Sequence, residues 1–370
     1  MYKKYLLVIA LGLGTQLSNA QAYEFQSVKD IEANPVISQD ITGTCWSFST
    51  TSFLEAEIIR LTGKHIDLSE MYNVRNTYPK KAWNYVMRQG KAQFGEGGLA
   101  HDVINSARDF GVVPQSVYSG KLATDEKYNH AEMTAVLEAM LKTYVENPGR
   151  KLSPQWKEAI NAVLDVYMGK NVTEFTYEGK KYTPKSFMEM TKLNANDYVT
   201  ISSFINEPLY KPFLLDIPDN FSNGSFYNLP LDEYIQNIDN AIDNGFTVAL
   251  DCDVSENTFS GKNGIAVIAE NDTDAKVITT EIKQEKIISP EYRQAEFENL
   301  DTQDDHLMHI VGKVKDQTGK MYYKVKNSWG SKSGKEGFVY MSVSYLKLKS
   351  ISVLLHKDGL TKTTKSKLGL

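Results

Sequence analysis

The hydrophobic and polar positions of this chain change their pattern near residue 245. Before that point, apolar residues recur every three to four positions, which is the periodicity of an amphipathic helix. In the first such segment Thr44 is a plausible N-cap, and Gly63 can end the helix. The periodicity predicts helices over residues 44–61, 69–88, 99–110, 129–146, 153–168, 183–192 and 231–244.

After residue 245 the pattern favours strands, in which successive side chains point to opposite faces. The turn-forming run at 316–320 joins two of them and predicts a hairpin. A helical first part followed by a β-rich last part indicates an α+β fold. The strands are expected over residues 246–250, 307–315, 321–326, 338–343 and 351–355.

The N-terminus has the pattern of a cleaved export signal. Lys3 and Lys4 precede a short apolar run at 5–13, and a small-x-small triplet ends at Ala20. The run is too short to span a bilayer, so no stable membrane anchor is expected. We therefore predict that residues 1–20 are removed and that the protein is periplasmic or extracellular.

The rest of the chain divides into four segments by composition. We expect a helical lobe at 21–120, a mainly helical insertion at 121–245, a β-rich lobe at 246–356 and a tail at 357–370. The tail is basic and rich in Ser and Thr, and we expect it to be mobile. The insertion is polar, and its predicted helices are joined by loops rich in Asn, Asp, Gly and Pro.

Composition narrows the possible functions. The chain has 370 residues, 41% of them hydrophobic, and a net charge of -5, which suits a globular protein and disfavours nucleic acid as a partner. Its two cysteines are Cys45 and Cys252. If Cys45 is a working nucleophile it must stay free, so no internal disulfide is available.

Cys45 is the candidate nucleophile. A thiol attacks as thiolate, and the N-terminus of a helix favours negative charge, so we expect a lowered pKa for a cysteine at the start of helix 44–61. Gly43 allows the substrate to approach the backbone closely. Gln39 can place its side-chain amide beside the backbone N–H of Cys45, where the two would stabilise an oxyanion.

The general base must be a histidine near Cys45. His306 and His309 lie in a predicted strand, and three positions apart they point to opposite faces, so only one of them can face the nucleophile. Asn327 ends the next strand and can orient the imidazole through its side-chain carbonyl. Trp329 can cover that hydrogen bond from water.

The same segment could be interpreted as a metal site, because Asp304 and Asp305 precede His306 and His309. Two histidines at this spacing share a face on a helix but not on a strand. We therefore expect no metal, and no cofactor.

The set Gln39, Cys45, His306 and Asn327 resembles the papain superfamily, and most of all its bleomycin hydrolase and aminopeptidase C branch. The resemblance spans nearly the whole chain after the export signal. It implies a papain-like two-lobed fold and peptide hydrolysis through a Cys-His-Asn triad. It also selects His306 as the base, Gln39 for the oxyanion hole, and the pair Gly97-Gly98 for binding the substrate backbone.

The branch further implies an aminopeptidase, whose C-terminal tail lies in the cleft and admits only free N-termini. A homo-oligomer is possible on the same ground, and the expected partners are peptides or proteins as substrates. Three alternatives stay open: an open-cleft cysteine endopeptidase, an inactive homologue that only binds peptides, and an enzyme that transfers the acyl group to an acceptor other than water.

Overall fold

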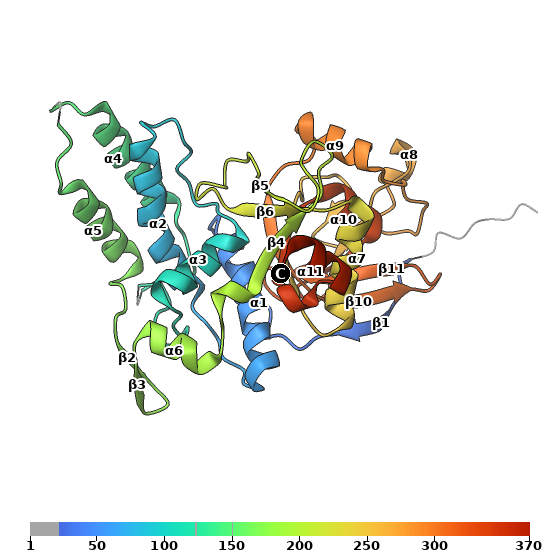
Figure 1. Ribbon diagram of the computed structural model, residues 1–370, viewed down its shortest axis with the longest axis horizontal. Helices are drawn as coiled ribbons and strands as arrows, with labels where there is room; N and C mark the ends of the chain where they lie inside the picture. Colours follow the sequence, from blue (N-terminus) through green and yellow to red (C-terminus); the bar gives the residue numbers. More distant parts are fainter. Residues whose placement is uncertain (1–21, 123, 150) are drawn as a thin grey trace, which may run out of the picture.

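The computed structural model describes residues 22–122, 124–149 and 151–370 (Figure 1). The predicted export signal at 1–20 lies outside these residues. In the described part of the chain, no helix is both long and apolar enough to cross a membrane. The α+β prediction is confirmed: the helices of the first half of the chain gather at one end of the molecule, and a large sheet with the remaining helices lies at the other (Figure 1).

The helical end is formed by six helices, and each lies within three residues of its predicted bounds. α1 runs from the inside of this end along the sheet, while α2 packs against α4 and α5 at the periphery (Figure 1). The helices are α1 (Cys45–Thr62), α2 (Glu70–Met87), α3 (Ala100–Phe110), α4 (Ala131–Glu146), α5 (Trp156–Met168) and α6 (Pro184–Thr191).

Eleven strands of the described residues form the main sheet, with β10 near its middle, and two others form a separate hairpin. The strand order is β5-β6-β4-β13-β7-β10-β11-β12-β9-β8, and β1 also pairs with β10. The predicted hairpin is confirmed as the antiparallel pair β10–β11. The strands are β1 (Phe25–Asp30), β4 (Tyr198–Ser202), β5 (Pro212–Leu214), β6 (Ser225–Asn228), β7 (Val248–Cys252), β8 (Phe259–Ser260), β9 (Ile265–Ala266), β10 (His306–Asp316), β11 (Met321–Lys326), β12 (Phe338–Ser342) and β13 (Ser350–His356).

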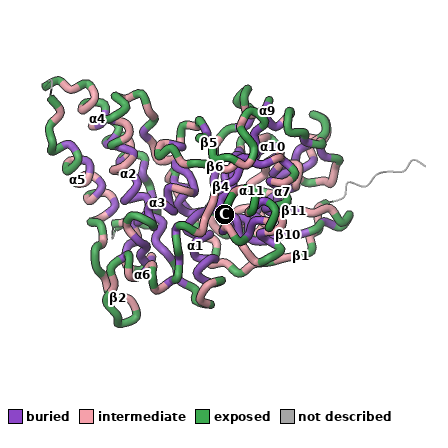
Figure 2. Tube along the Cα trace, viewed as in Figure 1, coloured by how far each residue is buried: buried purple, intermediate pink, exposed green. Residues whose placement is uncertain are grey.

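The sheet separates two large hydrophobic clusters, because alternate strand residues face opposite sides. Leu307 of β10 belongs to the cluster on the α1 side, whereas Met308 and Ile310 belong to the other cluster. Figure 2 shows that buried residues concentrate in α1 and the central strands. The remaining elements are β2 (Phe175–Tyr177), β3 (Lys180–Tyr182), α7 (Leu231–Asp243), α8 (Asp272–Ala275), α9 (Pro290–Glu298), α10 (Val343–Lys349) and α11 (Lys362–Leu368).

The segment 121–245 is less uniformly helical than its pattern suggested. Its helices α4, α5 and α6 join the helical end, but β4, β5 and β6 extend the main sheet. These strands are three to five residues long, too short to show a clear alternation. The segment therefore contributes to both lobes.

The prediction of a mobile tail was wrong. After β13, residues 362–368 form α11, which begins at a capping Thr361 whose side chain accepts a hydrogen bond from the N–H of Thr364. Thr364 is fully buried, and its hydroxyl donates to Glu233 of α7 (2.6 Å) and accepts from Asn237 (2.9 Å). The Ser and Thr content of the tail thus supplies a helix cap and buried hydrogen bonds.

Candidate active site

Cys45 is the first residue of α1 and is 8% exposed. Thr44 stands at the N-cap as predicted, but its hydroxyl pairs with that of Thr42 (2.6 Å) and does not cap the helix. Among the described residues, the backbone N–H of Cys45 has no hydrogen-bond acceptor, as expected for the first turn of a helix. A substrate oxygen next to the thiol can therefore accept from this N–H.

His306 and Asn327 are joined by a hydrogen bond of 2.8 Å between Nε2 and the side-chain Oδ1. His306 begins β10, and Asn327 directly follows β11, so the hairpin brings them together. An amide oxygen only accepts, so Nε2 carries the proton. Nδ1 of His306 is then the nitrogen that can take the proton of a thiol.

Trp329 covers this pair. Its ring lies 4.9 Å from that of His306, centre to centre, with an angle of 32° between the planes. Gly261 is packed so closely against the indole that a side chain there would overlap it. The indole is 38% exposed and therefore lies between the imidazole and the solvent.

Gln39 is held in place by three contacts. Its backbone N–H donates to the carbonyl of Ser328 (2.9 Å), and its side-chain oxygen accepts from the hydroxyl of the same residue (2.6 Å). Its side-chain NH₂ donates to the carbonyl of Thr42 (2.6 Å). One N–H is used there, which leaves the second N–H of the amide for a ligand.

The pKa of the Cys45 thiol differs from the sequence expectation. Burial raises it to about 12, and the carboxylates of Asp304, Asp219 and Asp251 act in the same direction, although the backbone of Leu307 lowers it. The helix N-terminus does not outweigh these effects. Burial also lowers the pKa of His306, although the hydrogen bond to Asn327 acts in the opposite direction. Burial thus favours the neutral form of both groups.

His309 lies further along the same strand and is part of the buried interior. Its Nδ1 is bonded to the hydroxyl of Ser52 in α1 (3.0 Å), and it is 1% exposed. His306 and His309 therefore use their rings on different partners, and the structure does not bring them together with Asp304 and Asp305 as one metal-binding group. Cys252, at the end of β7, is fully buried and packs in the core.

Gly97 and Gly98 lie next to the start of α1. A side chain at position 98 would approach the indole of Trp46 to 3.1 Å. A side chain at position 97 would overlap the carboxylate of Asp219, and the Gly97 carbonyl accepts a hydrogen bond from Lys81. Sequence reasoning missed Asp219 and Lys81, because neither belongs to a motif.

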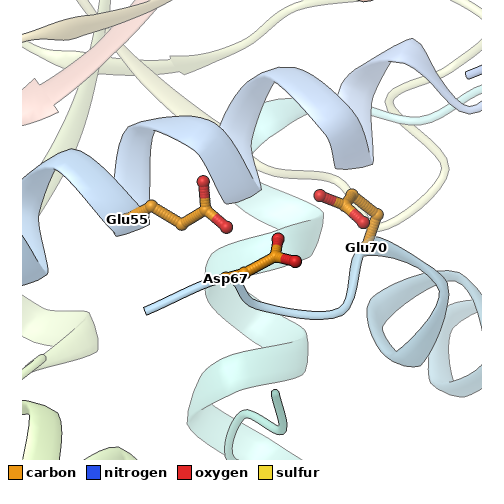
Figure 3. A group of neighbouring side chains, drawn as sticks. All are labelled: Glu55, Asp67 and Glu70. Carbon is orange, nitrogen blue, oxygen red and sulfur yellow. The ribbon is translucent and has the colours of Figure 1, made fainter. Parts of the chain in front are cut away.

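A second acidic group lies within the helical lobe (Figure 3). Ligand atoms of Glu55, Asp67 and Glu70 all lie within 4.8 Å of one another, and the three carboxylates point toward a common centre. Lys326 is close enough to lower the pKa of Glu55 by its positive charge. The three carboxylates are arranged so that a cation could bind between them, but the ammonium group of Lys326 already supplies positive charge there.

The helical and β-rich lobes, with a cysteine at a helix start and a His–Asn pair on the sheet, define a papain-like cysteine peptidase. The chain belongs to the peptidase C1-like family, whose sequence profile matches residues 86–369. That range contains Gly97, His306 and Asn327, but begins after Gln39 and Cys45.

Individual relatives extend the similarity to most of the chain. Aminopeptidase G of Lactobacillus delbrueckii subsp. lactis is 24% identical over 90% of this chain and 83% of its own length. Aminopeptidase C of Lactococcus lactis subsp. lactis is 22% identical over 94% of this chain and 85% of its own length. The crystal structure of PepW from Lactobacillus rhamnosis superposes with a TM-score of 0.73 at 18% identity, over 93% of this chain and 84% of that one. This likeness confirms the predicted fold.

Proposed function

We propose that this protein is an aminopeptidase that removes residues from free peptide N-termini, with Cys45, His306 and Asn327 as its triad. The observation that supports the triad most directly is the 2.8 Å bond between His306 and Asn327. It fixes the tautomer in which Nδ1 is free to accept the thiol proton. The names of the relatives, aminopeptidases C and G, support the exopeptidase assignment.

In the acylation step, the thiol proton of Cys45 passes to Nδ1 of His306 as sulfur attacks the scissile carbonyl carbon. Because the isolated thiol has a pKa of about 12, the thiolate depends on the imidazolium formed with it. The oxyanion of the tetrahedral intermediate accepts from the backbone N–H of Cys45 and the side-chain amide of Gln39. His306 then gives its proton to the leaving amine, and a thioester remains.

In the deacylation step, a water molecule loses a proton to Nδ1 of His306 and attacks the thioester carbonyl. The C–S bond breaks, the thiol of Cys45 regains the proton, and the free amino acid leaves. Asn327 keeps the ring oriented through both steps, and Trp329 keeps water away from their hydrogen bond. Gly97 and Gly98 would contact the substrate backbone.

The test is hydrolysis of one dye-linked amino-acid amide with its amine free and then acetylated. The Cys45→Ala variant should lose about 10³-fold or more of kcat. Cys252→Ala is the matched control, because it removes the other cysteine, which lies in the sheet core. Cleavage of the free form alone supports an aminopeptidase. Equal cleavage of both forms supports the endopeptidase alternative, and binding of peptides without turnover supports the inactive homologue.

We also propose that residues 1–20 direct export and are removed. The charged start, the apolar run and the small-residue triplet support this assignment. N-terminal sequencing of the protein from its native cells should begin at Gln21. A chain that retains Met1 in the cytoplasmic fraction would contradict export.

A further inference from the structure

The loop between β5 and β6 carries Asp219 to the nucleophile from the far edge of the sheet. Asn220 holds the loop internally, donating to the carbonyl of Leu215 (2.9 Å) and accepting from the N–H of Gly224 (2.7 Å). Ser222 fastens it to α3 by donating to Asp102 (2.7 Å). The position of Asp219 is therefore built into the fold.

Asp219 occupies the space beside Gly97. A Cβ atom on Gly97 would overlap its carboxylate, so a larger residue there would force the side chain of Asp219 to move. Gly97 belongs to the pair predicted to bind the substrate backbone. An extended peptide that continued along Gly97 would meet Asp219, so this carboxylate limits how much chain can precede the cleaved bond.

Two more carboxylates belong to the same group. Asp304 lies two residues before His306, and Asp251 lies in β7 opposite Leu307. Asp251 is 2% exposed, and its Oδ1 accepts no N–H or O–H from the residues that the structure describes, although the carboxyl of Asp304 lies within hydrogen-bonding range of Asp251. A buried carboxyl oxygen without a donor is rare and indicates either a proton shared with its neighbour or a missing ligand or water.

Carboxyl groups outnumber cations in this group. Lys81 is the nearby cation, and its ammonium group donates to the carbonyl of Gly97. Asp219, Asp251 and Asp304 lie close enough to Cys45 to affect the thiol electrostatically. A partly dehydrated site with surplus negative charge attracts a cation. In a peptidase the cation next to the first scissile bond is the α-ammonium of the substrate.

We propose that Asp219, supported by Asp304 and Asp251, binds the α-ammonium group of the substrate and blocks longer peptides from the groove along Gly97. This inference rests on the proposed aminopeptidase function. The C-terminal tail does not supply this anion in the structure. Within the described part of the chain, the side chains of α11 bond to α7, to Tyr210 and to residues of the tail itself.

The test compares wild type with Asp219→Asn, which keeps the size of the side chain and removes its charge. The free-amine amide should lose about 10–100-fold in kcat/KM, mainly through KM, as expected for an ion pair in a partly buried site. The acetylated amide should be cleaved as well as before or better. Asp216→Asn is the matched control, because Asp216 is exposed in the same loop, and it should change neither rate.

If Asp219→Asn loses kcat/KM equally on both substrates, Asp219 has only a structural role. If the variant loses no activity on the free-amine amide, the proposal is wrong. Asp219→Glu should recover part of the free-amine activity, which a purely structural defect would not. If Asp219→Asn fails to fold, Asp304→Asn provides the same comparison. If wild type cleaves neither amide, the proposed function fails. If wild type cleaves only the free-amine amide, and Asp219→Asn and Asp304→Asn behave as wild type does, the aminopeptidase function stands and only the role of Asp219 is contradicted.

Discussion

Two groups of three acidic residues invite comparison: Asp219, Asp251 and Asp304 in the cleft, and Glu55, Asp67 and Glu70 in the helical lobe. In both groups burial raises the pKa of every member. The group in the helical lobe comes from neighbouring stretches of chain, whereas the cleft group comes from three distant elements.

The groups differ in how their charge is balanced. Lys326 serves the helical-lobe group, and its ammonium is held by the carbonyl of Asn34 (2.7 Å) and the hydroxyl of Ser52 (2.7 Å). Glu55 also accepts from the N–H of Leu68 (2.8 Å). The cleft group has Lys81, which bonds to Gly97. The same residue types thus stabilise the fold in one place and remain available to a ligand in the other.

The largest expected effect is on the helical-lobe group. Lys326→Met removes the cation from two buried carboxylates, Glu55 and Glu70, and from the exposed Asp67, and should lower the free energy of unfolding by about 3–5 kcal/mol. Lys324→Met is the control on the same strand, because its ion pair with Asp30 (2.9 Å) is at the surface and is worth about 1 kcal/mol or less. Denaturant unfolding measures both. Equal losses would show that Lys326 does not balance this group.

A smaller effect is expected on how the free energy of unfolding depends on pH. The pKa of Glu55 is raised to about 7, chiefly by burial, so the folded chain holds a proton that the unfolded chain releases above about 4.3. The stability contributed by this group should therefore fall as pH rises from 4.3 to 7. Glu55→Gln should gain roughly 1–3 kcal/mol relative to wild type between pH 5 and pH 8.

Glu138→Gln, an exposed change in α4, is the control for Glu55→Gln and should show no such gain. Urea unfolding at the two pH values gives the comparison. A constant difference between wild type and Glu55→Gln would contradict the raised pKa.

The cleft group predicts a pH effect on activity. The pKa of Asp304 is raised to about 7 by burial and Asp219, with Asp305 adding and Lys81 opposing. Burial and the neighbouring Asp304 also raise the pKa of Asp251 well above its usual range. As Asp304 ionises above pH 7 it should bind an ammonium better, until the α-amine deprotonates near 8. The ratio of kcat/KM for free and acetylated amides should therefore peak between these values and vary about tenfold.

Asp304→Asn should flatten the rising limb of that profile. Because the acetylated amide experiences the same changes at Cys45 and His306, the ratio isolates amine binding. A ratio that is constant from pH 6 to 8 would contradict a role for Asp304.

The smallest expected effect is on specificity after removal of residues 362–370. Loss of the bonds from Thr364 to Glu233 and Asn237 should lower stability by about 1–3 kcal/mol. The ratio of activities on free and acetylated amides should stay unchanged, because Asp219 remains. A gain of about tenfold or more in cleavage of the acetylated amide would assign the selection to the tail.

Elements with strong local patterns could be predicted from the amino-acid sequence. Helices such as α1 and α2 were predicted closely because caps and apolar spacing act within a few residues. The hairpin that brings Asn327 to His306 was also predictable, since a turn and two flanking strands lie together in sequence. The candidate triad could therefore be identified before its geometry was known.

Other features were decided by tertiary structure. The short strands β4 to β6 form because they pair with strands of the main sheet. α11 is held in place by a hydrogen bond to α7. The sequence also placed Cys45 at a helix start, which alone would lower its pKa, but burial raises it. Burial and electrostatic fields depend on every element packed around a group. For the same reason, only the fold could bring Asp219, Asp251 and Asp304 to one nucleophile.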